Sequence, residues 1–311
     1  MALVTIEKSP DNLGLGVLVG HHESNTPEWH DLRRTGIGGS DVAPILGLSP
    51  WTSPYTFWAK KTGQIADNIA DSDAMEWGRR LEGVILQKFA DNHPEFHVRT
   101  GFGTYANRGR PWQLANPDGV FEWDDPIRKG DDTFNSVQRG IVEVKTAAYE
   151  DDWKDGVPAY YRSQVLWYLQ TFGYSRAFVV VLFAGRRYRE FEILADDWEM
   201  ETNLIEVTKF KEQFIDAAEV PPFTAPFTST YETVRTQNPN IEDLEVELHE
   251  LGDAYLAALD AYQATESFLN QMRSEVLSLM GTAKRGLIGG EWRVTRQARN
   301  GGAPYLVNKK G

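Results

Sequence analysis

Cysteine is absent from all 311 residues of the sequence. This absence excludes disulfide bonds, thiolate zinc sites and iron–sulfur clusters, and it fits the reducing environment of a cytoplasm. Long hydrophobic runs are also missing. The apolar residues 13–20 are too few and too rich in glycine to form a signal peptide or a membrane span. We therefore expect a soluble cytoplasmic protein that does not associate with membranes.

The sequence also has few basic residues: its 32 Lys and Arg residues are outnumbered by 45 Asp and Glu residues. The net charge of −13 argues against a simple nucleic-acid binder, which is usually basic. The acids are concentrated, however. Residues 190–219 hold ten acids against two lysines, and residues 239–280 hold nine against one arginine. The remainder is slightly basic, so a local site for phosphate is compatible with the acidic total.

Apolar periodicity predicts alternating helices and strands over the first 220 residues. The expected helices cover residues 54–62, 71–92, 158–172 and 196–218, and the expected strands cover residues 96–102, 112–115, 118–123, 140–146, 177–184 and 187–194. The polar residues 124–139 are expected to form a loop. This alternation predicts an α/β fold with a central mixed β-sheet flanked by helices.

Three prolines, at positions 221, 222 and 226, interrupt the chain after these elements. We expect a core domain over residues 1–220, a linker over 221–240 and a tail over 241–311. Apolar residues of the tail recur in steps of four and three from Leu244 to Leu279, which predicts a long C-terminal helix. Its seam would pack on residues 196–218 of the same chain, or on a neighbouring subunit or partner. A small basic β-hairpin around Gly289-Gly290 is expected to follow.

The main functional pattern is two acidic residues followed by a lysine. Asp118 begins one expected strand, and Glu143 and Lys145 lie two residues apart on another. Because strand side chains alternate, Glu143 and Lys145 share a face, while Val142 and Val144 point into apolar packing. Paired carboxylates hold Mg²⁺, which polarises a phosphoryl oxygen, and a lysine neutralises developing charge. The alternative is a surface salt bridge, since Glu-x-Lys alone is common.

Glu82 is a further candidate within the expected helix over residues 71–92. Ile85 and Leu86 are its neighbours on the helix surface, so a carboxylate on this partly apolar face needs a partner. That partner is either Arg79, in an ordinary ion pair, or a metal ion shared with Asp118 and Glu143.

Taken together, these motifs resemble the YqaJ-type phage exonucleases, which are similar to lambda exonuclease and belong to the PD-(D/E)XK nuclease superfamily. The resemblance is carried in order by residues 29–33, 36–47, 78–82, 117–119, 143–145 and 160–164. It implies a restriction-endonuclease-like fold and 5′-to-3′ hydrolysis of linear double-stranded DNA, in homologous recombination by single-strand annealing. It also implies a homo-oligomeric ring, for which we favour a trimer, and a single-strand annealing protein as partner. A phage-encoded enzyme would act in the bacterial cytoplasm.

The same resemblance assigns roles to individual residues. Asp118, Glu143, the Val144 carbonyl and Glu82 correspond to metal ligands for Mg²⁺, with Mn²⁺ expected to substitute. Lys145 corresponds to the catalytic lysine, and Gln164 to a glutamine near the site. Arg33, Ser40 and Tyr161 are expected to contact DNA or a 5′-phosphate.

The residues themselves leave alternatives for this end-binding region. Ser40 is expected to cap a helix after the glycine turn at residues 36–39, and Arg33 can grip a phosphate or be an ordinary solvated arginine. The aromatic residues Trp51, Tyr55, Phe57 and Trp58 are expected to be core, with a stacking platform as the alternative. A non-catalytic DNA-end binding module and an endonuclease of repair or defence remain competing functions.

Overall fold

The computed structural model describes residues 5–6, 10, 12–23, 26–66, 72–129, 132–224, 227–299 and 301–308. The chain divides into two compact units, residues 1–240 and 241–311. Within the described residues, no helix combines the length and the apolar character needed to cross a membrane.

The first unit is built on a six-stranded mixed sheet with the order β1-β4-β7-β8-β9-β10. Its strands are β1 (Thr5–Ile6), β4 (His97–Thr100), β7 (Gly119–Lys129), β8 (Asp132–Ala147), β9 (Arg176–Phe183) and β10 (Arg187–Leu194). Two neighbouring pairs of this sheet, β1–β4 and β8–β9, run parallel. The other three pairs are antiparallel. The parallel pair β8–β9 needs a crossover, which the helix α5 (Ala159–Phe172) provides.

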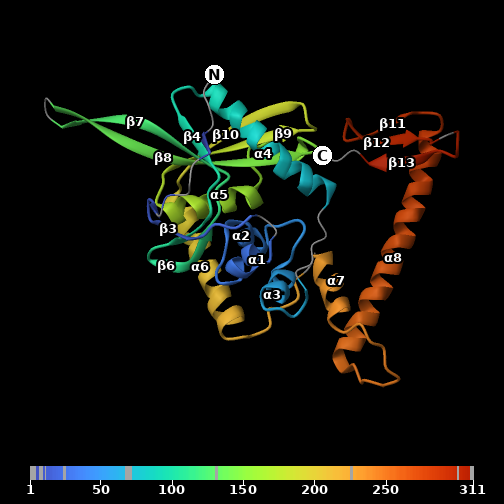
Figure 1. Cartoon of the computed structure of the whole chain (residues 1–311). Coiled ribbons are helices and arrows are strands. Elements are labelled where there is room, and N and C mark those ends of the chain that lie inside the picture. The colour runs from blue at the N-terminus through green and yellow to red at the C-terminus, as the bar shows by residue number, and fades with distance from the viewer. Residues whose placement is uncertain are drawn as a thin grey trace. The chain divides into compact units, whose positions relative to one another are not determined.

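Helices cover both faces of this sheet (Figure 1). On one face α4 (Asp73–Asn92) packs Ile85, Leu86 and Phe89 against the sheet. On the other face α5 packs with α2 (Gly39–Ile45), α3 (Pro54–Lys61) and α6 (Asp197–Phe210), which continues as the π-helix η2 (Lys211–Asp216). The short helix α1 (Pro27–Arg34) precedes α2 and has no buried residue. The short 3-10 helix η1 (Asp151–Trp153) precedes α5. The predicted mixed sheet flanked by helices is therefore confirmed.

A second sheet of the first unit was predicted only for residues 112–115, which lie within its strand β6. It has the order β2-β3-β5-β6 and comprises β2 (Asn12–Leu13), β3 (Gly16–Gly20), β5 (Thr104–Asn107) and β6 (Arg110–Ala115). Leu13 and Tyr105 of this sheet are buried in the same core as α5. The other three strands, β2, β3 and β5, are short and contain glycine or polar residues, so their apolar alternation is too brief to be recognised.

Residues 124–129 and 132–139 do not form the expected loop, and residues 130–131 of that prediction lie outside the described residues. β7 and β8 continue as paired strands from Gly119 opposite Val142 to Lys129 opposite Asp132, and the resulting hairpin extends past the helices (Figure 1). Asp124, Asp125 and Val137 are exposed. The backbone N–H and C=O groups of such a hairpin are hydrogen-bonded by the strand pairing itself. Where neither face packs on a core, the side chains need not alternate between apolar and polar.

The segment expected as a linker, residues 221–240, contains the helix α7 (Thr228–Gln237). Thr233 of α7 hydrogen-bonds Thr56 of α3 at 2.8 Å, and the Ser229 hydroxyl accepts the Ser53 backbone N–H at 3.0 Å. Gln237 accepts a hydrogen bond of 2.7 Å from the Tyr55 hydroxyl. These side-chain bonds attach α7 to the first unit, although its amphipathic pattern is weak.

The second unit contains the predicted long helix, α8 (His249–Met280), with 32 residues. It begins at His249, after the first apolar position of the predicted pattern, Leu244, and is about 48 Å long at 1.5 Å per residue. The predicted hairpin is present as β11 (Arg285–Ile288) and β12 (Glu291–Gln297), joined by Gly289 and Gly290 at φ of 62° and 83°. A third strand, β13 (Tyr305–Asn308), pairs with β12.

Candidate active site

The predicted acidic residues and lysine are brought together beside β8. Val142 and Val144 are buried on the α4 face of the sheet, so Glu143 and Lys145 face α5, as strand alternation predicts. Lys145 Nζ lies 2.5 Å from Glu143 Oε1. The Glu143 side chain is only 2% exposed, which excludes the alternative of a surface salt bridge.

Asp118 lies directly before β7, next to β8. Its Oδ2 accepts the backbone N–H of Val144 at 2.8 Å, and its carbonyl accepts the Thr100 hydroxyl at 2.8 Å. Gly119 follows because space is limited: a Cβ at this position would lie 2.9 Å from Leu86 Cδ2 of α4. The Asp-Gly pair thus allows α4 to approach while a carboxylate remains at the strand start.

Gln164, from α5, contributes to the same cluster. Its Nε2 donates to Glu143 Oε1 at 2.6 Å and to the Tyr168 hydroxyl at 3.2 Å. Tyr168 was not singled out from the sequence, although its position one helical turn after Gln164 is a usable signal. Gly39 of α2 packs against it, since a Cβ there would lie 2.4 Å from the Tyr168 ring.

If all three carboxyl groups of this cluster were ionised, they would carry more negative charge than Lys145 neutralises. Burial raises the pKa of Glu143 to about 8, and the charge of Asp118 adds to this effect. Burial, Asp118 and Glu143 likewise raise the pKa of Glu82, on α4, to about 8. The pKa of Asp118 is raised by burial although Lys145 and the Val144 N–H oppose the increase. Glu82 therefore belongs to the same electrostatic cluster as the strand residues.

The donor set fits a hard cation. Within the described ranges no group of three His, Asp or Glu side chains is already gathered in metal-binding geometry. Glu143 Oε2, however, is buried without a hydrogen-bond partner among the described residues. Carboxylate oxygens that repel one another are the ligands Mg²⁺ prefers, and a cation would offset their repulsion. Asp118, Glu143 and Glu82 are the side chains that would hold it.

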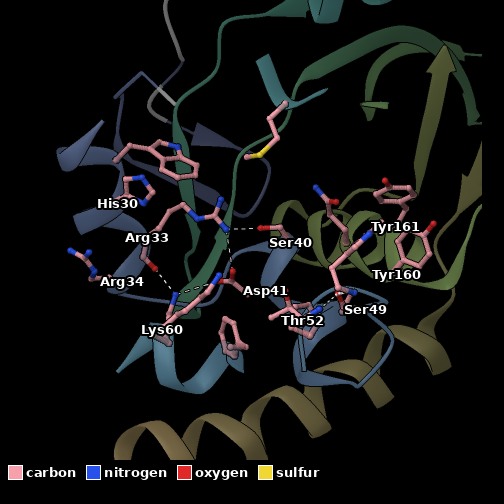
Figure 2. A pocket seen from close by; sticks show the side chains of 18 of the residues that line it. His30, Arg33, Arg34, Ser40, Asp41, Ser49, Thr52, Lys60, Tyr160 and Tyr161 are labelled. Atoms are coloured by element: carbon pink, nitrogen blue, oxygen red, sulfur yellow. Dashed lines mark hydrogen bonds and ion pairs between the residues drawn. The ribbon is translucent and has the colours of Figure 1, made fainter. Parts of the chain in front are cut away.

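A cavity of about 550 Å³ opens next to this cluster and is lined by Gln164 and Tyr161 (Figure 2). Its wall is cationic, in contrast to the chain as a whole. Five Lys and Arg residues line it against a single carboxylate, Asp41, and they include Arg33 and Lys61. Such a cavity attracts an anionic ligand.

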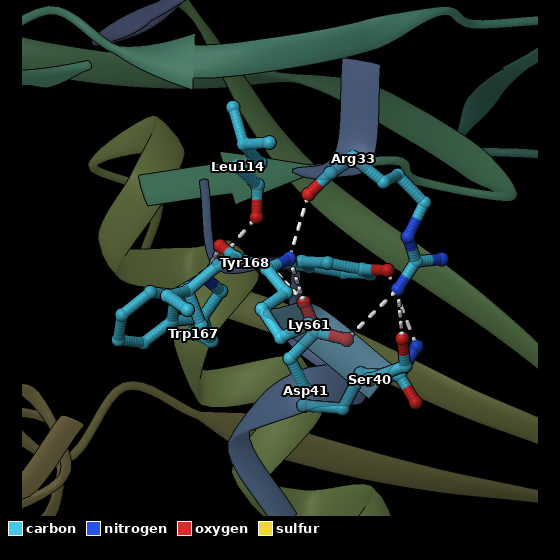
Figure 3. Close-up of polar contacts among 10 residues, drawn as sticks. Arg33, Ser40, Asp41, Lys61, Leu114, Trp167 and Tyr168 are labelled. Atoms are coloured by element: carbon cyan, nitrogen blue, oxygen red, sulfur yellow. Dashed lines mark hydrogen bonds and ion pairs between the residues drawn. The ribbon is translucent and has the colours of Figure 1, made fainter. Parts of the chain in front are cut away.

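Arg33 and Ser40 meet in this wall, as expected, but Ser40 is not the helix cap. Gly38 is the N-cap of α2, and its N–H is accepted by Asp41 Oδ2 at 2.9 Å. Arg33 Nη2 donates to Ser40 Oγ at 2.5 Å and to Asp41 Oδ1 at 3.1 Å (Figure 3). The prediction of a capping serine was wrong because Asp41, three residues after Gly38, satisfies the cap instead.

Lys61 completes this group and was missed. Its Nζ donates to the Arg33 carbonyl at 2.6 Å and to Asp41 Oδ2 at 3.2 Å (Figure 3). Burial alone would raise the pKa of Asp41, but Lys61, Arg33 and the Gly38 N–H outweigh it and lower that pKa. Lys61 lies twenty residues from Asp41 on another helix, so only its basic charge was visible in the sequence.

The expected aromatic cluster divides in two. Tyr55, Phe57 and Trp58 are buried, as the core interpretation predicted. Trp51 is 63% exposed and lines the cavity together with Tyr161. Lys145 Nζ lies 4.9 Å from the centre of the Tyr161 ring, so Tyr161 connects the cavity wall to the buried cluster.

Comparison with known proteins finds a family match over the part of the chain that carries these residues. Residues 28–175, which contain every candidate residue above, match the family model of the YqaJ-like viral recombinase domain. The uncharacterized protein YqaJ of Bacillus subtilis (strain 168) is 28% identical over 284 residues, which cover 88% of this chain and 84% of that protein. A protein of African swine fever virus (isolate Tick/Malawi/Lil 20-1/1983) is 31% identical over 154 residues, or 44% of this chain and 43% of the viral protein.

Solved structures show weaker similarity. An alkaline exonuclease from Laribacter hongkongensis has a TM-score of 0.49 at 19% identity, covering 62% of this chain and 94% of that chain. A putative exonuclease from Eubacterium rectale has a TM-score of 0.38 at 13% identity, covering 74% and 98%. Both TM-scores are below 0.5. The match of residues 28–175 to this family model confirms the resemblance that the motifs of the sequence indicate.

Proposed function

Because residues 28–175 match the family model of the YqaJ-like viral recombinase domain, we propose that this protein is a Mg²⁺-dependent deoxyribonuclease that degrades linear double-stranded DNA from 5′ ends during recombination. The observation that carries the proposal is the buried contact of Glu143 with Lys145 and Gln164, beside Asp118 and a cationic cavity. A purely structural ion pair has no need of the additional, mutually repelling carboxylates.

In this proposal Asp118, Glu143, the Val144 carbonyl and Glu82 hold Mg²⁺, for which Mn²⁺ substitutes. The bound ion supplies Lewis-acid stabilisation of negative charge on the scissile phosphate. Lys145 places a fixed positive charge where the phosphate accumulates negative charge during hydrolysis. Its ammonium group is held between Glu143 and the Tyr161 ring, so it needs little reorganisation.

Arg33 and Ser40 are proposed to bind the phosphate at the 5′ end. Arg33 is already oriented by Ser40, by Asp41 and by the Trp29 ring, whose centre lies 4.5 Å from its guanidinium carbon. A guanidinium fixed before binding loses less side-chain entropy when it grips a phosphate. Tyr161 lies between this wall and Lys145 and would contact the same strand.

The active form is proposed to be a homo-oligomeric ring, with a trimer favoured, that cooperates with a single-strand annealing protein in the cytoplasm of its host. Support comes from α8: none of its residues is buried, and heptad positions such as Leu251 and Tyr262 are exposed. An apolar seam of this kind is typical of a helix that assembles with another helix.

The direct test is digestion of linear 5′-phosphorylated duplex beside covalently closed circles, with Mg²⁺ or with EDTA, using 5′ or 3′ labels. We expect cutting of the linear DNA only, with early release of the 5′ label, and none with EDTA or with Glu143→Gln. Cutting of closed circles would favour an endonuclease. Binding of ends without cutting would favour a non-catalytic end-binding module.

A further inference from the structure

Trp51 differs from the aromatic residues that follow it in the sequence. It lies between α2 and α3, is 63% exposed, and lines the cavity that also contains Arg33 and Gln164. Exposure alone indicates little, since Trp198 of α6 is 78% exposed and does not line this cavity. The position of Trp51 within a cationic cavity is what calls for an explanation.

The loop that carries Trp51 is fixed by hydrogen bonds. The hydroxyl of the buried Ser49 accepts the backbone N–H groups of Trp51 at 3.3 Å and Thr52 at 3.1 Å. Ser53, which follows Thr52, is fully buried, and its hydroxyl accepts a hydrogen bond of 2.7 Å from the Thr230 hydroxyl of α7. The indole is therefore held at the cavity by both ends of a short turn, which lowers the cost of ordering it around a ligand.

An aromatic series runs from Trp51 toward the buried cluster. The Trp51 and Tyr160 rings meet edge to face, with centres 5.1 Å apart at 77°. The Tyr160 and Tyr161 ring centres are 4.4 Å apart, and Tyr161 lies beside Lys145. In Figure 2 both tyrosines lie on the side of the cavity opposite Arg33. The cavity thus has phosphate-binding chemistry on one side and aromatic surface on the other.

Phosphate next to an aromatic face is the chemistry of a nucleotide in a single strand. We propose that Trp51 stacks on the unpaired base of the 5′-terminal nucleotide while the cationic wall holds its phosphate. This inference rests on the proposed function and adds to it a specificity-determining residue. Every base has a π-face on which an indole can stack. The contact should therefore discriminate against an abasic 5′-terminal nucleotide but not between the four bases.

Binding is tested without cutting, in EDTA, with a duplex that carries 2-aminopurine as the 5′-terminal base. We expect wild-type protein and Trp198→Ala to quench its fluorescence, Trp51→Phe to quench it partly, and Trp51→Ala to leave it unquenched. Equal quenching by Trp51→Ala and wild type would overturn the proposal. Urea unfolding of each variant identifies one that has lost its fold.

Cutting is tested under single-turnover conditions with Mg²⁺ on duplexes whose 5′-terminal nucleotide is intact or abasic. Wild-type protein is expected to cut the intact end about 5- to 150-fold faster, the range that base–aromatic stacking supplies. Trp51→Ala should cut both at the slower rate. Equal wild-type rates, or a loss with Trp51→Ala that is the same on both ends, would refute the stacking role. If no DNA is cut, the proposed nuclease function fails, while the fluorescence measurement still decides the stacking.

Discussion

Gln164 Nε2 donates a hydrogen bond of 2.6 Å to Oε1 of Glu143, the same oxygen that Lys145 contacts. One oxygen of the carboxylate is thereby fixed by α5 and by β8, while Oε2 has no hydrogen-bond partner within the described residues. In the proposed function, this division would leave Oε2 available to a cation. Gln164 would then be a positioning residue that acts through Glu143.

We therefore expect Gln164→Leu to lower the cutting rate about 10- to 100-fold and to raise the Mg²⁺ concentration needed for half-maximal rate, as loss of a ligand's hydrogen-bond partner does. The measurement is a Mg²⁺ titration of single-turnover rates. Gln170→Leu is the control, because Gln170 lies on the same helix but bonds Gln113 and Met200. A normal Mg²⁺ dependence in Gln164→Leu would remove Gln164 from the site.

Lys145→Ala should reduce the cutting rate about 10²- to 10³-fold even at saturating Mg²⁺, because its positive charge acts in the transition state. Lys154→Ala is the matched control, since Lys154 is exposed and pairs with Asp151. Full rescue of Lys145→Ala by additional Mg²⁺ would mean that the lysine only helps to retain the ion.

Arg33→Ala should abolish the preference for a 5′-phosphate over a 5′-hydroxyl end, which we expect to be about tenfold or more in wild type from a charge-assisted hydrogen bond. The wild-type preference should shrink as salt is raised, since the contact is electrostatic. When duplexes with a 5′-phosphate and with a 5′-hydroxyl end compete in one reaction, the ratio of their cutting rates gives the preference directly. Arg80→Ala serves as control, because Arg80 is exposed and pairs with Glu76. An unchanged ratio in Arg33→Ala would leave Arg33 a structural residue of the cavity wall.

Asp41→Asn should destabilise the fold at neutral pH by roughly 3 kcal/mol, because it leaves the buried Lys61 without its partner. The folded pKa of Asp41 is lowered from its ordinary value of 3.8, so its ionised form stabilises the fold above that pH. This contribution is lost as pH falls through 3.8 toward the folded pKa. Urea unfolding at pH 7 and near pH 3.5 should show the difference between variant and wild type shrinking in acid. The exposed Asp31→Asn should cost less than about 0.5 kcal/mol at either pH.

Light scattering on the full chain should give a multiple of 35.2 kDa, with threefold favoured, and a chain ending at Asn240 should dissociate at higher concentration. Tyr262→Glu, on the seam of α8, should act like the truncation, whereas Gln263→Glu beside it should not. A full-length monomer at micromolar concentration would refute the ring. A truncated chain that assembles normally would instead assign α8 to partner binding.

The core of the site was predictable because it depends on local rules. Strand alternation alone places Glu143 and Lys145 on one face and Val142 and Val144 on the other. Gln164 required the family resemblance, since a glutamine in an apolar helix gives no functional signal by itself. Its contact with Glu143 joins residues 21 positions apart, and no periodicity encodes such a pair.

The elements that were missed depend on tertiary context. The hairpin of β7 and β8 is polar because solvent reaches both faces, so its sequence resembles a loop. Helix α7 follows three prolines and has only two buried residues, Thr230 and Thr233. Both are polar and are satisfied by hydrogen bonds to α3, an arrangement that hydrophobic patterns cannot show.

The pairing of β7 with β8 proceeds one residue against one residue from the hairpin to the strand starts, without a register shift. The facing of Glu143 is fixed by this register and by its pairing opposite Val179 of β9. An odd insertion within the paired stretch must therefore be absorbed by a bulge or at the end of the hairpin, because a slip of one residue would turn Glu143 and Lys145 toward α4. Residues added in matched pairs, one on each strand, preserve the facing. The hairpin can therefore be lengthened in such pairs, and a peptide tag inserted beyond the paired residues should be tolerated.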